Sequence, residues 1–273
     1  MPNHPLAEVF GFPTDNLSAT AERYRRNKLC PYHNKVPSCI KDKAKDPLGV
    51  CSIYEGEHLA VTCPVRFRQD WLIIEDAANF LFAPGTNWTS LQEVRLNDAE
   101  GKSAGNIDFV LVAYDELGRI TDFGALHVQA VSTKGNIRQP FAQYMAHREI
   151  EVSMVEPASQ TKANYAESFR EQLLPQLVYK GAMLQAWGKK QAVALQRPLF
   201  ETLPQLPTVP REEADMVWLI YDLEFLTEQN RHQLVLHHTK YTKFDPAWQK
   251  IASPTVISSD RFVAELDVMV EAR

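Results

Sequence analysis

The sequence predicts an α/β protein whose mixed central sheet is flanked by helices and preceded by a four-cysteine metal-binding module. Apolar, β-branched runs at 107–114 and 119–131 enclose a short polar turn, which is typical of an antiparallel hairpin. Every cysteine of the chain, 4 in all, lies between residues 30 and 63. Helical periodicity at 162–191 is followed by a buried-looking strand pattern at 216–226, so helices and strands alternate.

The length of 273 residues allows one large or two modest domains. We expect an N-terminal helix and cysteine module over 1–83 and an α/β core over 84–273. A formal net charge of −5 does not indicate a nucleic-acid binder, although a local basic surface is sufficient for one. The sequence shows neither a basic leader nor a long apolar run. The expected location is therefore the cytoplasm, without a membrane partner.

The first predicted element is a short helix at 16–27, capped by Asn16 or Ser18. It carries Arg23, Arg25 and Arg26 close together. These arginines either contact phosphates or form a solvated helix face, and the sequence leaves both interpretations open.

The cysteines Cys30, Cys39, Cys51 and Cys63 follow this helix. Because stable disulfides are disfavoured in a reducing cytosol, the cluster favours a structural site with four thiolates around zinc or iron. Its spacings are long and contain no CxxC pair, so they do not follow the common zinc-ribbon pattern. The alternative is four buried free cysteines.

Further along the chain, periodicity and turn residues define the remaining elements. Helices are expected at 66–82, from Pro140 toward His147, at 162–191 with an interruption at Pro175, and at 258–272. Strands are expected at 91–96, 216–226 and 232–241, and the proline-rich stretch 197–212 is expected to be a surface connection.

The hairpin gathers the residues that predict chemistry. Asp108 lies on its first strand, and His127 and Gln129, two positions apart on the second strand, share one face. Glu93 lies on the strand before them. An Asp followed by two polar residues around one apolar residue on the paired strand is the layout of PD-(D/E)xK nucleases, where carboxylates on adjacent strands hold a divalent cation. The alternative is a polar sheet edge satisfied by water.

Three groups of motifs, taken together, resemble the NotI-type restriction endonucleases of the PD-(D/E)xK group. They are EVFGFP near the start, CPY…SCIK…GVCSI…VTCP through the cysteine stretch, and ID…GALHVQA in the hairpin. The resemblance covers about 8–141 and is weaker beyond.

This resemblance implies a structural iron at the four cysteines and a catalytic Mg²⁺ or Mn²⁺ near Glu93, Asp108 and Gln129. The usual glutamate of the family falls on His127, which replaces a carboxylate by a neutral ring and shifts metal preference toward ions that accept nitrogen ligands. Gln129 cannot act as a general base and would orient the attacking water.

The expected function is therefore that of a type II restriction endonuclease, a homodimer that hydrolyses double-stranded DNA at a specific, palindromic site. The alternative is a DNA-binding relative that no longer cuts, or that uses another metal, because of His127. A third interpretation, an unrelated metal-stabilised α/β protein, would be favoured if the protein bound no DNA at low salt.

Overall fold

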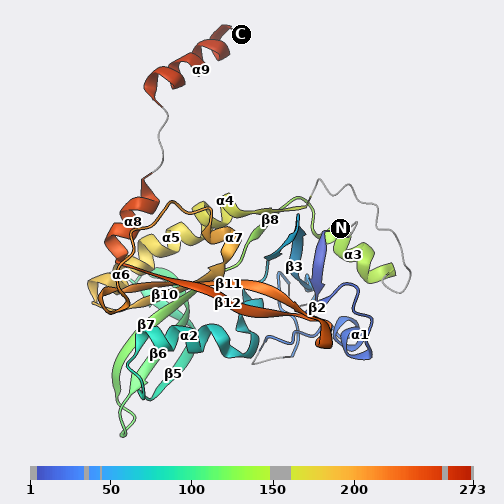
Figure 1. Ribbon diagram of the computed structural model, residues 1–273, viewed down its shortest axis with the longest axis horizontal. Coiled ribbons are helices and arrows are strands. Elements are labelled where there is room, and N and C mark those ends of the chain that lie inside the picture. Colours follow the sequence, from blue (N-terminus) through green and yellow to red (C-terminus); the bar gives the residue numbers. More distant parts are fainter. Residues whose placement is uncertain (1–4, 34–36, 44, 148–160, 254–257, 272–273) are drawn as a thin grey trace.

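The computed structural model describes residues 5–33, 37–43, 45–147, 161–253 and 258–271. A six-stranded mixed sheet with the order β12-β11-β10-β7-β6-β5 forms its centre (Figure 1). Strands β7, β10 and β11 are parallel to one another, and the outer pairings are antiparallel. The strands are β5 Trp88–Asn97, β6 Ser103–Tyr114, β7 Ile120–Gln129, β10 Gln191–Gln196, β11 Met216–Leu226 and β12 Arg231–Thr242.

Helices cover both faces of this sheet, which confirms the predicted α/β class. On one face, α2 (Leu72–Leu81) packs against residues of the central strands such as Leu126 and Ala194. The other face is covered by a helix running through residues 165–186 and by α8 (Phe244–Ala252). Figure 1 shows α2 on the side of the sheet opposite α5, α6 and α8.

The hairpin predicted from turn chemistry is confirmed as β6 and β7. The side chain of Asp115 accepts hydrogen bonds from the backbone N–H groups of Leu117 and Arg119, at 3.0 and 2.9 Å. This arrangement closes the turn without help from the rest of the fold. Register follows from it, with Phe109 opposite Leu126 at the far end of the ladder.

The helical region at 162–191 is shorter and less interrupted than predicted. Its first residues form β9 (Lys162–Asn164), and Pro175 does not end the helix. Wider π-helical turns on both sides of the proline accommodate the backbone hydrogen bond that proline cannot donate. The continuous helix consists of α4 Tyr165–Glu167, η2 Ser168–Leu173, α5 Leu174–Gln176, η3 Leu177–Gly181 and α6 Ala182–Ala186.

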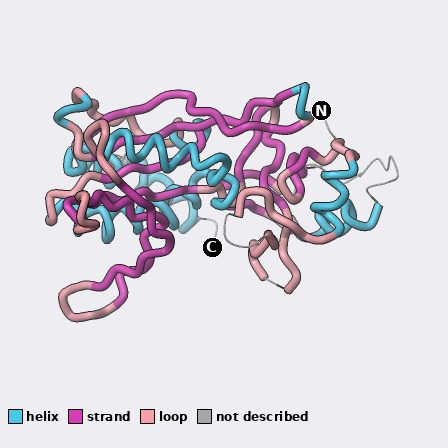
Figure 2. The backbone as a smooth tube through the Cα atoms, turned by 90° about the horizontal axis from the view of Figure 1, so that it is seen from below, coloured by secondary structure: helices cyan, strands magenta, loops and turns pink. Residues whose placement is uncertain are grey.

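A second, four-stranded sheet with the order β2-β1-β3-β4 lies at the N-terminal end of the molecule. Figures 1 and 2 both show it at the end that carries the N-terminus, away from β5 and β6. It has its own apolar cluster, which includes Leu6, Val50 and Ile53. Its strands are β1 Leu6–Val9, β2 Phe12–Pro13, β3 Val50–Glu55 and β4 His58–Val61.

Helix α1 (Ala19–Arg26) is confirmed, with Ser18 as its N-cap. Both interpretations of its arginines fail for Arg25, whose side chain is fully buried. Its guanidinium donates to the carbonyls of Pro13 and Asn16, each at 2.6 Å, and so fixes the loop before the helix. Sequence spacing could not reveal this, because a surface arginine and a buried one look alike in a charge run.

The predicted helix at 66–82 is divided into a 3₁₀ segment, η1 (Pro64–Trp71), and α2. The division occurs at Asp70 and Trp71, which both have left-handed backbone conformations. Although α2 precedes residue 83, it packs on the six-stranded sheet, and the two-domain division stays a prediction. The other elements are β8 Ser132–Lys134, α3 Arg138–His147, α7 Arg197–Phe200, η4 Arg211–Glu213, η5 Thr227–Gln229 and α9 Ser259–Glu271.

Two further predictions can be compared with the described residues. The helix expected at 258–272 is present as α9, and Ala272 lies outside the described residues. Within the part of the chain that the structure describes, no helix is both long enough and apolar enough to cross a bilayer.

Candidate functional site

Asp108 lies where β6 and β7 separate. The β6–β7 ladder ends at the pair Phe109 and Leu126, so the backbone N–H of Val128 has no partner in the backbone of β6. The carboxylate of Asp108 accepts a hydrogen bond of 2.9 Å from this N–H instead. The carboxylate is thereby held at the end of the hairpin, partly buried between two strands.

Glu93 lies across from Asp108 on β5. Its neighbours Gln92 and Val94 pair with Phe109 and Ile107, and Glu93 itself has a left-handed φ of 55°. The backbone of β5 is therefore irregular at the position opposite Asp108, although the strand continues to Asn97. The Glu93 side chain is 68% exposed and lies 3.8 Å from Arg68.

The pKa of Asp108 is raised above its usual value. Burial is the main cause, and the charge of Glu93 acts in the same direction. The N–H of Val128 and the positive charges of Lys180 and Arg68 oppose this effect without cancelling it. The ionised form of a buried carboxylate is stabilised more by a nearby cation than that of a solvated carboxylate.

His127 is 1% exposed, and neither ring nitrogen has a hydrogen-bond partner. Burial lowers the pKa of the ring to about 3, and the positive charge of Lys180 contributes. The imidazole is therefore neutral at physiological pH, with a free lone pair. Gln191 lies close enough to favour the charged ring slightly, but its own Oε1 also has no hydrogen-bond partner.

Gln129 is oriented by the helix that covers this face of the sheet. Its Nε2 donates to the carbonyl of Ala130 at 2.6 Å and to Oε1 of Gln172 at 2.8 Å. Both amide hydrogens are used in this way, and the side chain is 4% exposed. The amide oxygen of Gln129, which is neutral and held in place, remains available to accept a hydrogen bond.

Two cations that were not among the predicted site residues also belong to this site. Lys180, from η3, donates its Nζ to the carbonyl of Asn106 and to Oε1 of Gln176 at 3.4 Å. The backbone of β6 approaches it closely at Gly105, whose φ is 92° and where an added Cβ would lie 3.4 Å from Cε of Lys180. Burial lowers the pKa of Lys180, while Asp108 raises it.

Arg68 is the second of these cations and comes from η1. Its guanidinium lies 5.3 Å from the ring centre of Phe109 and donates to Gln92 at 3.2 Å. The structure thus brings Asp108 and Glu93 together between two cations, with His127 near Lys180. Among the described residues, no three His, Cys, Asp or Glu side chains are grouped so that they could hold a metal ion.

The four cysteines come in two backbone-paired sets. In the first, the N–H of Cys30 donates to Pro37 at 2.6 Å, and the N–H of Cys39 donates to Lys28 at 2.8 Å. In the second, Cys51 on β3 accepts from the N–H of Thr62 at 2.9 Å, one residue before Cys63. Each hairpin therefore presents two thiols from adjacent segments.

All four cysteines are free thiols in one neighbourhood. The pKa of Cys30 is raised to about 11, mainly by burial and further by Cys63 and Cys39. Burial and then Cys63 likewise raise the pKa of Cys51. An all-sulfur donor set fits a thiophilic cation such as zinc or iron, but the sulfur atoms would have to move closer together to hold one.

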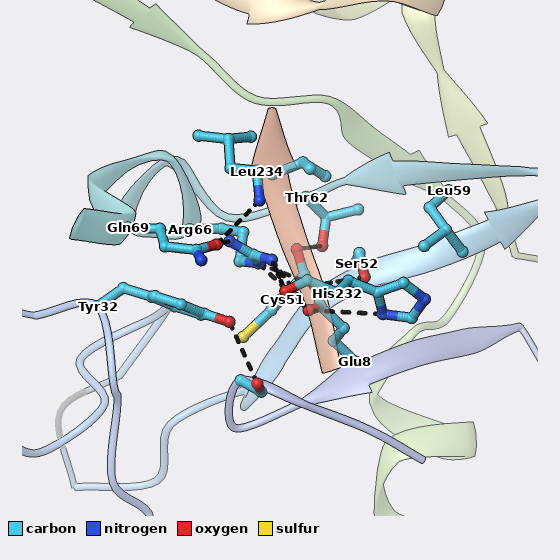
Figure 3. A network of polar contacts seen from close by, with 12 residues as sticks. Glu8, Tyr32, Cys51, Ser52, Leu59, Thr62, Arg66, Gln69, His232 and Leu234 are labelled. Carbon is cyan, nitrogen blue, oxygen red and sulfur yellow. Dashed lines mark hydrogen bonds and ion pairs between the residues drawn. The ribbon is translucent and has the colours of Figure 1, made fainter. Parts of the chain in front are cut away.

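A buried ion pair connects this cysteine region to the six-stranded sheet (Figure 3). Glu8 on β1 and Arg66 on η1 are both fully buried and lie 3.0 Å apart. Arg66 also donates to the carbonyl of His232 on β12 at 2.9 Å, and Ser52 donates to Glu8 at 2.8 Å. Figure 3 shows Cys51 beside this network, so the cysteine region packs against it.

Comparison with known families adds one finding. A family model described as "Restriction endonuclease NotI" matches residues 15–234. This range contains all four cysteines, both carboxylates of the site, His127, Gln129, Lys180 and Arg68. No curated protein matches the chain.

Proposed function

The chain belongs to the NotI restriction endonuclease family, and from this premise we propose that it hydrolyses double-stranded DNA at a specific palindromic site with a divalent cation. We also propose that its core is of the PD-(D/E)xK type. The observation that carries the proposal is the pair Asp108 and Glu93, on adjacent strands and across from each other, with Lys180 and Arg68 beside them.

Each of these residues has a role in the proposed reaction. A divalent cation, when bound, would polarise the scissile phosphate and lower the pKa of the attacking water. Asp108, Glu93 and His127 would hold that cation. Gln129 would orient the water through its fixed carbonyl oxygen. The positive charges near Asp108 would stabilise the negative charge that develops on the phosphate.

His127 makes the choice of metal the discriminating property. A neutral ring nitrogen in place of a carboxylate weakens a site for Mg²⁺ and favours Mn²⁺ or Co²⁺. The second candidate function is a DNA-binding relative that does not cut. The burial of the ring favours it, because the His127 side chain is 1% exposed and must be uncovered before its nitrogen can bind a cation.

The test of the catalytic roles is cleavage of unmethylated DNA in the presence of Mg²⁺, Mn²⁺, Co²⁺ or Zn²⁺. Asp108→Asn should abolish discrete fragments with every metal while mobility-shift binding at low salt is retained. Asp122→Asn is the matched control, since Asp122 lies on the same hairpin but pairs with Lys189 at 2.7 Å. Equal activity of both variants would refute the assignment of Asp108.

The role of His127 is tested separately. His127→Glu should raise Mg²⁺-dependent cleavage, and His127→Gln, which remains neutral, should not. Full wild-type cleavage with Mg²⁺, unchanged by His127→Glu, would show that the ring only lies beside the site and that Glu93 supplies the charge. Specific binding without cleavage in any metal would favour the second candidate function.

We further propose that the four cysteines bind one structural zinc or iron ion. Cys30, Cys39, Cys51 and Cys63 would supply thiolates, and the ion would join the two hairpins that carry them. A fully occupied tetrahedral site leaves no position for substrate, so its contribution is to folding rather than to the reaction.

A homodimer is the remaining part of the proposal, because two symmetric active sites are the simplest means of cutting both strands of a palindrome. Helix α9 supports it, since its apolar residues lie exposed at helical spacing, including Phe262 at 52% and Leu266 at 42%. Leu266→Asp should convert the dimer to a monomer in sedimentation analysis. A wild-type monomer, both free and on DNA, would refute this part.

A further inference from the structure

A polar cavity of about 490 Å³ lies between the cysteine region, η1 and the turn that joins β11 to β12. Its volume is within the range of small-molecule sites. Its wall includes Tyr32, Arg68, Asp70, Trp71, Arg231 and Gln233.

The cavity adjoins the candidate active site at Arg68. Arg68 lines the cavity, and its guanidinium donates to Gln92 and lies 3.8 Å from Glu93. A molecule in the cavity would therefore be separated from Glu93 by the Arg68 side chain. The space itself takes no part in the proposed hydrolysis.

One guanidinium in the wall of the cavity has no ion-pair partner among the described residues. Arg231 lies 4.7 Å from the ring centre of Phe12, and no carboxylate of the described residues forms an ion pair with it. Arg66, behind Tyr32, is already neutralised by Glu8, as Figure 3 shows. Arg68 is paired with Glu93, so Arg231 is the unpaired guanidinium of the described lining, and Asp70 is the one acidic side chain of that lining.

Trp71 adds an exposed aromatic surface. Asp70 and Trp71 have φ values of 51° and 60°, a conformation that costs energy for residues with a side chain. This backbone places the indole at the division between η1 and α2, where it lines the cavity and is 37% exposed. An exposed tryptophan beside arginines is the combination that binds nucleic-acid bases by stacking and phosphates by charge.

We propose that this cavity binds one nucleotide of the substrate DNA, with its base against Trp71 and its phosphate at Arg231. Asp70 and Gln233 provide hydrogen-bonding groups for the edge of the base. The base must leave the duplex stack to enter, as it does in enzymes that extrude a nucleotide. The inference rests on the proposed function, because DNA is the ligand that supplies such a nucleotide.

The first experiment measures tryptophan fluorescence during titration with the four 2′-deoxynucleoside 5′-monophosphates, without metal. Stacking on Trp71 should give saturable quenching that Trp71→Phe removes. Trp187→Phe is the matched control, because Trp187 is 48% exposed and lies outside the cavity lining. Absence of saturable quenching in the wild-type protein, or its persistence in Trp71→Phe, would overturn the proposal.

The second experiment tests the charge. Arg231→Gln should raise the dissociation constant of the nucleotide by about 10-fold or more, the effect of losing a charge-assisted hydrogen bond. Arg119→Gln is the control, since Arg119 lies at the hairpin turn and its side chain is 73% exposed. Equal affinities in both variants would contradict a phosphate site at Arg231.

Cleavage assays separate this inference from the proposed function. If DNA is cut and Trp71→Ala lowers kcat/KM by about 5- to 100-fold with normal thermal stability, both stand. Quenching without cleavage in any metal would refute the nuclease while leaving the nucleotide site in place. Cleavage that Trp71→Ala and Arg231→Gln leave unchanged would refute the site and leave the nuclease.

Discussion

Replacing Glu8 by glutamine should destabilise the protein more than any surface substitution does. Glu8 and Arg66 are both inaccessible to solvent, and the carboxylate accepts from Nε and Nη2 of the guanidinium. Glu8→Gln keeps the shape but removes the negative charge, so Arg66 remains buried with its charge uncompensated. Its remaining acceptors are Gln69 and the carbonyl of His232.

The expected magnitude follows from this loss. Breaking a buried ion pair by removing one partner costs about 3–5 kcal/mol of unfolding free energy. For a chain of this size, each kcal/mol corresponds to about 2–4 °C, so the melting temperature should fall by about 6–20 °C. Differential scanning calorimetry at neutral pH measures this shift directly.

Two further variants make the argument refutable. Glu265→Gln, in an ion pair whose side chains are 72% and 52% exposed, should change the melting temperature by less than about 2 °C. The double variant Glu8→Leu with Arg66→Leu removes both buried charges and should be more stable than Glu8→Gln. Equal melting temperatures for Glu8→Gln and the wild type would show that the pair does not hold the N-terminal sheet to the core.

Three further predictions concern pH, packing and metal. Although burial raises the pKa of Glu8, Arg66 and His232 lower it to about 2. The contribution of Glu8 to the free energy of unfolding is therefore complete above pH 4.5 and is lost as the pH falls toward 2. Acid titration of Glu8→Gln should lack this loss of stability. Gly181→Ala should lower stability by about 1–3 kcal/mol in urea denaturation, because the new Cβ would lie 2.5 Å from Phe244, and an unchanged midpoint would contradict this packing. Elemental analysis of the wild-type protein should find about one zinc or iron ion per chain. The Cys39→Ser variant should lose this ion and show a marked drop in melting temperature. A fully folded wild-type protein without metal would exclude the site.

Local sequence signals predicted the elements whose structure is determined locally. The β6–β7 hairpin depends on its turn, where Asp115 accepts from two backbone N–H groups within four residues, and the sequence contains that information. The same holds for Ser18 as the cap of α1. Strand β10 was missed because its run QAVALQ is short, follows a helix and is buried throughout, so no alternation distinguishes it from the helix before it.

The candidate site was predicted only in its strand residues. Asp108, His127 and Gln129 share one hairpin, so period-two spacing predicts that they form a group; in the structure Asp108 accepts from the N–H of Val128, whereas Gln129 donates to Gln172. The charge of Lys180 acts on Asp108 from η3, on the face of the sheet opposite α2, and the charge of Arg68 acts on it from η1. The sequence around Lys180 and the sequence around Arg68 do not distinguish these residues from solvated cations. Their positions depend on the tertiary fold, which the periodicity of single elements does not determine.

The charge balance at Asp108 explains why the choice of cation should depend on residue 127. The carboxylates of Asp108 and Glu93 are offset by Lys180 and Arg68, and a ring with a pKa of about 3 adds no charge at neutral pH. The cation of the proposed reaction would therefore enter a site without excess negative charge. Mg²⁺, which relies on carboxylate oxygens, would gain least there, whereas Mn²⁺ and Co²⁺ would also gain from the ring nitrogen. A glutamate at this position would restore one net negative charge, so the metal preference should revert with that single substitution.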